Sequence, residues 1–373
     1  MSSLMERVAA KARGLDIPFG AHIDLTWKCN ERCVHCYLDH GAGGDMNTAE
    51  ILRVLDELAA AGTMFLTLSG GEIMLRKDIF EIVAYARSLM FDVRLKTNAT
   101  MIGEREAERF AGLGVRRVEI SIYSHCPETH DAITLMPGSF AKSIAGVRHF
   151  KRLGVTVEIH ASMMLQNAED SAGIHALAAE LGVKAKCDAS IIPRLDGDRT
   201  PVLLSIAKET VRQIFNAPSA TVEAEASCAP PLPLAGQEMD AYPCGAGHSL
   251  CYISPSGDVT PCVQYPVVCG NVRNQSLGEI WRSSPAFAAV RSVRVRDLPA
   301  DGTCENCAGL AYMEGKNLGS SGLDRFKSPA TAGVSSPLVQ VSGAGPRHTN
   351  PERDVPFAGT RVSPPLVQIA GPQ

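Results

Sequence analysis

The sequence lacks both a long apolar segment and an excess of charge of one sign. No apolar run approaches the ~20 residues that a membrane span needs, and residues 1–14 carry charges among their apolar side chains, unlike the core of a secretory signal. The formal net charge is only −4, which argues against electrostatically driven binding of nucleic acid or an anionic membrane. The sequence therefore predicts a cytoplasmic protein with no membrane and no nucleic-acid partner.

Cysteine is too scarce for a disulfide scaffold. The 373 residues include 12 cysteines, a share well below the ~8–10% of such scaffolds. In a cytoplasmic protein, grouped cysteines ligate metals or take part in chemistry more often than they form bridges. The isolated Cys126, Cys187 and Cys228 are expected to be small buried apolar residues. The grouped cysteines are Cys29, Cys33 and Cys36; Cys244, Cys251, Cys262 and Cys269; and Cys304 and Cys307.

Six predicted strands alternate with helices between residues 21 and 191. The first helix has a strong start signal, because Asn47 followed by Glu50 matches a capping box, and Gly62 is a natural stop. Such repeats give parallel strands with right-handed crossovers. They predict an α/β fold, either an open or closed barrel or a doubly wound sheet. The predicted strands are 21–27, 64–68, 92–96, 115–122, 155–163 and 183–191, and the later helices are 78–90, 104–112, 139–153 and 170–181.

Polar motifs follow the first four predicted strands. The first cysteine group follows strand one, residues 69–72 (Ser-Gly-Gly-Glu) follow strand two, and Thr97 and Asn98 follow strand three. Ser121 and Tyr123 close strand four. Because ligands of α/β folds gather beyond the carboxyl ends of the strands, these motifs are expected to form a single site.

The first cysteine group has the spacing Cys29-x3-Cys33-x2-Cys36. Three thiolates on a short loop can hold three irons of a [4Fe–4S] cube and leave one iron open to another ligand. A structural zinc ion is the first alternative, but it normally takes four ligands, and His35 is the nearby fourth candidate. A redox-active thiol group is the second alternative.

The cysteine spacing after strand one, together with the Gly-Gly-Glu after strand two, resembles the radical S-adenosylmethionine (SAM) superfamily over residues 18–195. The resemblance implies a partial (β/α)6 TIM-like barrel in which SAM chelates the open iron. It also implies that an electron donor such as flavodoxin or ferredoxin reduces the cluster. SAM is then cleaved to methionine and a 5′-deoxyadenosyl radical, which takes a hydrogen atom from the substrate.

The resemblance implies further roles at the strand ends. The two glycines let the backbone approach the methionyl ammonium of SAM, and the glutamate helps to fix that end. The tyrosine packs near adenine, while the asparagine and serine contact the ribose or simply cap their strands. A basic residue that often follows strand four in the family is missing, so Lys96 or Arg194 is expected to replace it. The predicted cofactor-binding residues are Tyr37, Gly70, Gly71, Glu72, Asn98 and Ser121.

The second cysteine region resembles a shortened SPASM domain, which holds auxiliary [4Fe–4S] clusters in many peptide-modifying radical enzymes. Cys244-x12-Gly257-x4-Cys262 matches its opening, but no cysteine follows Cys307. Six cysteines cannot supply the eight thiolates of two cubes, so one auxiliary cluster is predicted. A treble-clef-like zinc site is the alternative to this auxiliary cluster. No catalytic residue is assigned from the sequence. The preferred ligands are Cys244, Cys262, Cys304 and Cys307, with Cys251 as a substitute and Cys269 as a structural residue.

Composition and these motifs predict the domain organisation. Length and a 45% hydrophobic content fit two domains with ample cores. The C-terminal region is rich in proline and glycine and contains the near-repeat SPLVQ and PPLVQ, so it is expected to be disordered, with docking segments as an alternative. The predicted parts are an N-terminal extension (1–17), the radical SAM barrel (18–195), a linker (196–243), a small irregular cysteine-rich α+β domain (244–320) and a disordered tail (321–373).

The predicted activity is radical modification of a peptide or protein side chain, as in peptide maturation or cofactor biosynthesis. Since 28 residues precede Cys29, too few for a peptide-recognition domain, a separate peptide-carrier protein is an expected partner. Radical oxidation or rearrangement of a small metabolite is the enzymatic alternative. A zinc-stabilised adaptor is the non-enzymatic alternative.

Overall fold

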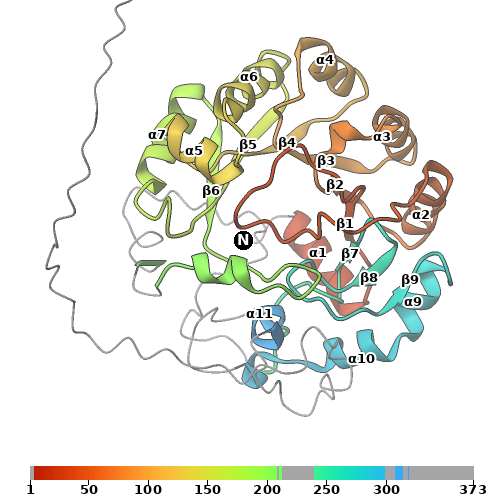
Figure 1. Ribbon diagram of the computed structural model, residues 1–373. Helices are drawn as coiled ribbons and strands as arrows, with labels where there is room; N and C mark the ends of the chain where they lie inside the picture. Colours follow the sequence, from red (N-terminus) through yellow and green to blue (C-terminus); the bar gives the residue numbers. More distant parts are fainter. Residues whose placement is uncertain (1–3, 208–209, 212–238, 299–306, 314–317, 319–373) are drawn as a thin grey trace, which may run out of the picture. The chain divides into compact units, whose positions relative to one another are not determined.

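The computed structural model describes residues 4–207, 210–211, 239–298, 307–313 and 318 (Figure 1). Within these ranges nine strands form one sheet in the order β6-β5-β4-β3-β2-β1-β7-β8-β9. The first six are parallel and lie in chain order, which confirms the predicted α/β fold with a partial TIM-like barrel. These strands are β1 (Gly20–Asp24), β2 (Phe65–Ser69), β3 (Asp92–Thr97), β4 (Arg117–Ser121), β5 (Thr156–Ser162) and β6 (Lys184–Asp188).

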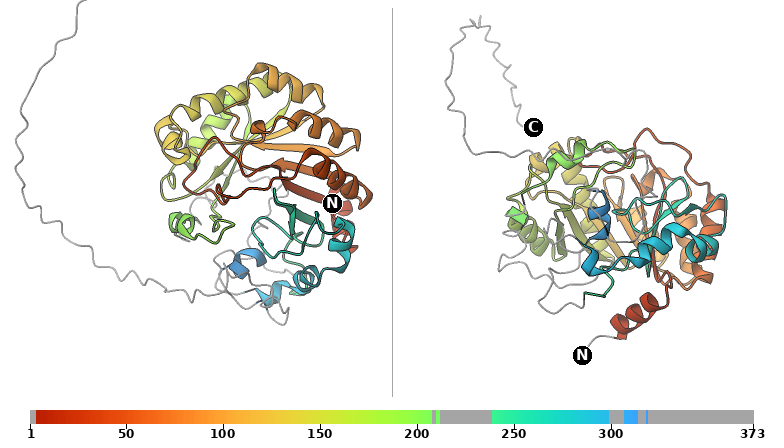
Figure 2. Two further views of the ribbon diagram at one scale, coloured as in Figure 1. Left: turned by 45° about the vertical axis from the view of Figure 1, so that its right-hand side comes forward. Right: turned by 90° about the horizontal axis from the view of Figure 1, so that it is seen from below.

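Helices connect these strands and cover the outer face of the curved sheet (Figures 1 and 2). Leu66 and Leu68 of β2 are buried against them, whereas the intervening Thr67 is half-buried on the other face. Polar and charged residues recur at the corresponding positions of the other strands, so the concave face of the barrel is polar. The covering helices are α2 (Thr48–Ala60), α3 (Ile79–Ser88), α4 (Glu104–Gly112), α6 (Ser139–Arg152) and α7 (Ser171–Leu181).

The start of α2 confirms the predicted capping box. The Asn47 side chain accepts from the Glu50 amide at 2.9 Å, and the Glu50 carboxylate accepts from the Asn47 amide at 2.7 Å. Two unpaired amides at the helix start are thereby satisfied. The first strand, in contrast, is shorter than predicted. Asp45 accepts from the Thr26 hydroxyl at 2.6 Å and the Trp27 amide at 3.1 Å, which draws the chain out of the ladder after Asp24.

Within residues 4–188, two helices were not predicted from the sequence. Helix α1 (Leu4–Gly14) precedes the barrel, and α5 (Pro127–Thr134) lies between β4 and α6. Proline at the first position of α5 needs no amide partner, and Leu135 ends this helix in the left-handed conformation with φ of 53°. Short helical segments also occur as η1 (Ile73–Leu75), η2 (Thr200–Leu204) and η3 (Val295–Asp297).

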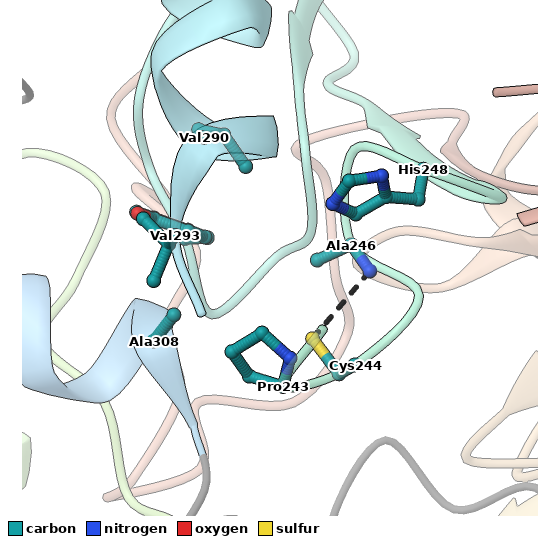
Figure 3. A pocket seen from close by; sticks show the side chains of 8 residues that line it. Pro243, Cys244, Ala246, His248, Val290, Val293 and Ala308 are labelled. Carbon is teal, nitrogen blue, oxygen red and sulfur yellow. Dashed lines mark hydrogen bonds between the residues drawn. The ribbon is translucent and has the colours of Figure 1, made fainter. Parts of the chain in front are cut away.

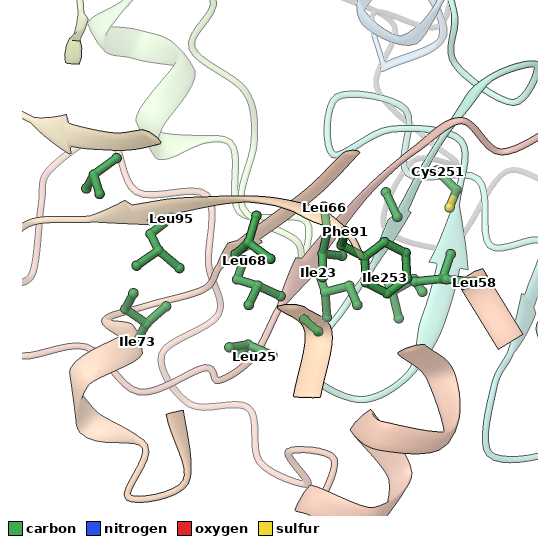
Figure 4. Close-up of a cluster of buried hydrophobic side chains, with 14 of the residues drawn as sticks. Ile23, Leu25, Leu58, Leu66, Leu68, Ile73, Phe91, Leu95, Cys251 and Ile253 are labelled. Atoms are coloured by element: carbon green, nitrogen blue, oxygen red, sulfur yellow. The ribbon is translucent and has the colours of Figure 1, made fainter. Parts of the chain in front are cut away.

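The C-terminal cysteine region extends the barrel sheet. Strand β7 (Leu250–Ile253) pairs in parallel with β1, and β8 (Asp258–Thr260) and β9 (Gly270–Asn271) continue antiparallel. The shared core joins Ile23, Leu66 and Ile253 with Leu58 of α2 (Figure 4). This α+β region is therefore continuous with the barrel rather than a separate layer. Its helices are α9 (Leu277–Ser283), α10 (Pro285–Ser292) and α11 (Ala308–Met313).

Some sequence predictions fall outside the described residues. These include Cys228, Cys304 and the tail with its repeated PLVQ segments. Among the helices of the described ranges, none combines the length and the apolar character that crossing a bilayer requires.

Candidate active site

The first cysteine group lies on the loop between β1 and α2, at the carboxyl edge of the sheet. Backbone bonds fix this loop from two sides. The Arg32 and Val34 amides donate to the Thr134 and Ile133 carbonyls of α5 at 3.1 and 3.0 Å. On the other side, the Glu72 amide donates to the Lys28 carbonyl at 2.9 Å. The unpredicted helix α5 therefore helps to position the cysteines.

The three thiols of this loop are close enough to influence one another. Burial raises the pKa of Cys29 to about 12, with smaller contributions from Glu72, Glu31 and Cys36. Burial also raises the pKa of Cys33, and the Glu31, Cys36 and Cys29 charges add to the effect. Buried thiols of this kind lose their protons when a metal binds them, so the donor set fits a metal cluster. The described residues contain no three His, Cys, Asp or Glu side chains that converge on one metal ion, whereas the thiolates of a cube bind different irons.

The two glycines after β2 pack directly against the cysteine loop. Gly70 has φ of 133°, and a Cβ there would lie 2.7 Å from the Thr26 carbonyl oxygen. A Cβ on Gly71 would lie 2.1 Å from the Lys28 carbonyl oxygen and 3.0 Å from Cys29 Cβ. Any side chain would push the cysteine loop away, so these glycines are required by the loop itself. Their predicted approach to the methionyl ammonium stays a prediction.

Glu72 is buried, and its carboxylate joins the ends of β2 and β3. It accepts from the Met74 amide at 3.0 Å, the Asn98 amide at 2.9 Å and the Thr97 hydroxyl at 2.8 Å. Burial raises its pKa, and these hydrogen bonds oppose the rise. The described contacts make Glu72 a brace for the site, and its contact with SAM stays a prediction.

Asn98 and Tyr37 are also held by protein contacts. The Asn98 side chain donates to Asn30 of the cysteine loop at 2.9 Å and accepts from the Thr100 amide at 2.9 Å. The hydroxyl of the half-buried Tyr37 donates to the buried Asp24 at 2.9 Å. Ser121 ends β4 and lies half-buried opposite His160 of β5. The structure thus brings the predicted residues to one edge, where their contacts with the cofactor stay predictions.

Asp24, a fully buried residue at the end of β1, is a site residue that was not predicted from the sequence. It accepts from Tyr37 of the cysteine loop at 2.9 Å and from Tyr252 of β7 at 2.7 Å, and it lies 3.1 Å from the His22 ring. One carboxylate therefore links the cysteine loop to the C-terminal cysteine region. An aspartate between the apolar Ile23 and Leu25 was the available signal.

Replacing Tyr252 by phenylalanine is expected to destabilise the protein by about 1.5–3 kcal/mol, because a buried carboxylate loses a hydrogen bond. Urea unfolding of the anaerobic protein measures this change. The matched control is Tyr85→Phe, since Tyr85 makes a similar 2.7 Å bond to Asp56 in an exposed position. That variant should change stability by less than about 0.5 kcal/mol. Equal effects of the two variants would contradict the role assigned to Asp24.

The two candidate basic residues have different surroundings. Lys96 of β3 lies 2.9 Å from Glu119, which also pairs with Arg94 at 2.7 Å. Burial opposes the ionisation of Glu119, but these two cations lower its pKa to about 2. Arg194 pairs with Asp198 at 3.2 Å, and its charge acts to lower the pKa of Cys36 against the larger effect of burial. The neighbouring Leu195 amide donates to the Tyr37 carbonyl at 2.8 Å, so Arg194 lies beside the cysteine loop.

His35 of the cysteine loop contacts Tyr123, which follows β4. Its ring packs edge-on against Tyr123 with the centroids 4.6 Å apart, and its Nδ1 is buried with no hydrogen-bond partner among the described residues. Burial, with a smaller effect of His160, lowers its pKa to about 4. His130 and Asp131, in contrast, serve the local fold, because Asp131 accepts from the Phe140 amide at 2.9 Å at the start of α6.

The C-terminal cysteines divide into two environments. Cys244 and Cys307 lie near Tyr265, and their charges raise its pKa further after the larger effect of burial. Cys244 also lines a pocket with Pro243, His248 and Val290, among others (Figure 3). Cys251, the predicted substitute ligand, points into the apolar core near Leu58 and Ile253 (Figure 4). Burial alone raises its pKa to about 12, so its surroundings favour a packing role.

The remaining members of this group are Cys262 and Cys269. Cys262 lies where the chain leaves β8, and its carbonyl accepts from the Thr260 hydroxyl at 3.0 Å. Cys269 is buried, and its thiol contacts the Val267 carbonyl at 3.4 Å. These surroundings are consistent with Cys262 as a ligand candidate and Cys269 as a structural residue.

Comparison with known families identifies both cysteine regions. A model described as the radical SAM superfamily matches residues 23–179. A model described as the SPASM iron–sulfur cluster-binding domain matches residues 244–308. The first match spans the first cysteine group, and the second match spans the two later groups.

Three curated relatives illustrate the range of similar proteins. The AdoMet-dependent heme synthase of Methanosarcina barkeri is 30% identical over 72% of this chain and 83% of its own length. The mycofactocin maturase MftC of Mycobacterium tuberculosis is 27% identical over 95% and 92%, respectively. The PqqA peptide cyclase of Rhodopseudomonas palustris is 28% identical over 91% of both chains.

A solved structure supports the fold. Streptococcus suis SuiB bound to S-adenosylmethionine is similar with a TM-score of 0.59 and 20% identity, covering 86% of this chain and 78% of that one.

Proposed function

Because the chain belongs to the radical SAM superfamily and carries a SPASM domain, we propose that it modifies a peptide side chain by hydrogen abstraction. Members of these families bind [4Fe–4S] clusters and SAM, and this chain is an enzyme of that class. When bound, the cluster and SAM together supply a 5′-deoxyadenosyl radical. The observation that carries the peptide assignment is that relatives named for peptide maturation align with over nine-tenths of the chain.

In this proposal, Cys29, Cys33 and Cys36 hold the cluster that binds SAM. The brace formed by Glu72 and the fit of the Gly-Gly segment hold their loop at the carboxyl edge of the barrel. Tyr37 and the backbone of residues 70–72 bind SAM, and Asn98 and Ser121 contact its ribose. Arg194 is the proposed partner of the methionine carboxylate, since its charge reaches the cysteine loop.

One auxiliary cluster is proposed for the SPASM domain. Its ligands are Cys244, Cys262 and Cys307 together with Cys304, which lies outside the described residues. Cys251 is the less favoured substitute because its thiol lies in the apolar core.

Paired variants separate these ligand assignments. Cys244→Ala is expected to lower the iron content by about four atoms per chain, because a cube missing one thiolate is lost. Cys251→Ala should leave the iron content unchanged and cost about 1 kcal/mol of stability through lost packing. Iron and sulfide assays on the anaerobic proteins measure both. Loss of iron from Cys251→Ala alone would reverse the assignment.

The proposal also covers domains, partners and location. The barrel occupies residues 18–195 and the SPASM domain residues 244–320, joined by a linker. An electron donor such as flavodoxin or ferredoxin reduces the cluster, and a peptide-carrier protein presents the substrate. The reaction takes place in the cytoplasm, where reducing conditions preserve the thiols.

A second candidate substrate is a small metabolite. The 30% identity to a heme synthase supports this candidate, since that relative is named for a tetrapyrrole product. The peptide assignment is favoured because its relatives cover more of the chain.

The two candidates are tested with the reconstituted enzyme, dithionite and SAM under anaerobic conditions. Short peptides encoded beside the gene are one set of substrates, and tetrapyrrole carboxylic acids are the other. A SAM-dependent change in peptide mass, with 5′-deoxyadenosine formed in proportion, is the expected result. Proportional consumption of a tetrapyrrole, with every peptide unchanged, would overturn the peptide assignment.

A further inference from the structure

Three residues on neighbouring strands form one row across the concave face of the barrel. Ser121 of β4 lies opposite His160 of β5, and His160 lies opposite Lys186 of β6. All three are half-buried, and their strand neighbours Ile120, Ile159 and Ala185 pack on the outer face. The row lies toward the carboxyl ends of the strands, on the side of the cysteine loop.

Lys186 forms no ion pair with a carboxylate among the described residues. The described residues place no carboxylate within 4.0 Å of its ammonium, in contrast to Arg94 and Lys96, which share Glu119. Two further acids lie on the same face. Glu158 is opposite Lys184 in the register, and Asp188 accepts from the Ser190 amide at 2.8 Å.

His160, which is opposite Lys186 in the register, has a ring nitrogen without a hydrogen-bond partner among the described residues. Its Nε2 is buried and has no hydrogen-bond partner in the described part of the chain. Burial lowers the pKa of this ring to about 4, so the ring is neutral at pH 7. The charges of Lys96 and Lys186 add to this effect, and those of Asp188 and Glu119 oppose it. In the tautomer that carries its proton on Nε2, the neutral ring has a buried N–H donor, and leaving that donor unpaired costs about 1–3 kcal/mol.

We propose that His160 and Lys186 form a subsite that binds a carboxylate group of the substrate inside the barrel. The assignment rests on the proposed function, because it deepens the substrate class of the same site. Lys186 supplies the charge and His160 a directed N–H donor. A monoanion is the expected ligand, because Lys186 offers one charge, and Glu119, Glu158 and Asp188 offset most of the charge of the other cations on this face, which are Arg94, Lys96, Arg117 and Lys184.

The position of the subsite relates it to the reaction. Ser121, the proposed ribose contact, directly adjoins His160 in the row. His35 of the cysteine loop is close enough for His160 to influence its ionisation. A carboxylate held here therefore places the carbons beside it near the expected position of the SAM ribose. His160 and Lys186 act as specificity-determining residues in this arrangement.

Binding is tested without turnover. Saturation-transfer NMR detects glutarate on the oxidised holoenzyme with SAM and no reductant. The wild type and Lys77→Met, which changes an exposed lysine outside the barrel, should give equal signals. The signal of Lys186→Met should fall at least about fivefold, as expected for loss of one charge-assisted bond. Glutaramide, which lacks the charge, should give none. An undiminished Lys186→Met signal overturns the proposal, as does a stronger signal from methylphosphonate than from glutarate.

Two more variants keep this test decisive. Lys186→Arg retains the charge and should keep most of the signal, whereas His160→Gln should weaken it. If Lys186→Met fails to fold, as judged by its unfolding curve, the His160→Gln and Lys186→Arg pair replaces it. Equal signals from that pair would overturn the proposal.

The source of the carboxylate is distinguished by competition. Acetyl-trialanine carries only a C-terminal carboxylate, and acetyl-Ala-Glu-Ala-amide carries only a side-chain carboxylate. The peptide that displaces glutarate identifies the source, and displacement by neither assigns the subsite to a small acid. Failure of every peptide to be modified would overturn the proposed function, while glutarate binding that depends on Lys186 would still support the subsite.

Discussion

Replacing Cys33 by alanine is expected to lower 5′-deoxyadenosine formation at least about 1,000-fold, because a cube bound by two of three thiolates does not persist. Cys33 lies near the centre of the cysteine loop, whose backbone is held by α5 on one side and by residues 71–72 on the other. The loss of activity should therefore come from loss of the cluster, and the protein should remain folded. Chromatographic assay of 5′-deoxyadenosine with dithionite and SAM measures it.

The matched control for this experiment is Cys126→Ala. Cys126 precedes α5, and its thiol makes no side-chain cap to that helix. This variant should keep wild-type activity within about twofold, as for other half-exposed substitutions. The iron content of Cys33→Ala should fall by about four atoms per chain while the SPASM iron remains. Full activity of Cys33→Ala would remove the cysteine loop from the reaction.

Replacing Gly71 by alanine is expected to displace the cysteine loop and abolish SAM cleavage. The new Cβ would lie 2.1 Å from the Lys28 carbonyl oxygen, a rigid backbone atom next to Cys29. Relief of that overlap requires the loop to move, and a shift of about 1 Å is enough to cost 100-fold in rate. Iron analysis should show a loss of about four irons per chain.

Gly43 provides the control for the glycine substitution. It lies in the same loop region between β1 and α2, and a Cβ there would meet nothing within 4 Å. Gly43→Ala should therefore retain its iron and its activity. If Gly71→Ala bound a full complement of iron and cleaved SAM normally, the packing of this glycine against the cysteine loop would not matter for the site.

The sequence predicted features that depend on neighbouring residues. The capping box at Asn47 and the parallel strands of the barrel are of this kind, because periodicity and cap chemistry are local. The gathering of the cysteine loop, Glu72 and Asn98 at one edge also followed from strand order. The family comparisons agree with the resemblance found in the motifs.

Features that depend on distant contacts were not predictable in this way. Asp24 acquires its role only when Tyr252, more than 200 residues away, donates to it. The parallel pairing of β7 with β1 is equally distant in sequence. The contact of Gly70 and Gly71 with the cysteine loop could not be predicted either, because the sequence indicated only that these glycines approach SAM. These cases share one cause: long-range packing overrides what a local pattern indicates.

The most direct test of the account is the metal and sulfide content of the wild-type protein after anaerobic purification. About eight irons and eight sulfides per chain are expected, from one SAM-binding cube and one auxiliary cube. Zinc without sulfide would contradict it, because the cysteine groups would then form structural zinc sites and could not support radical chemistry.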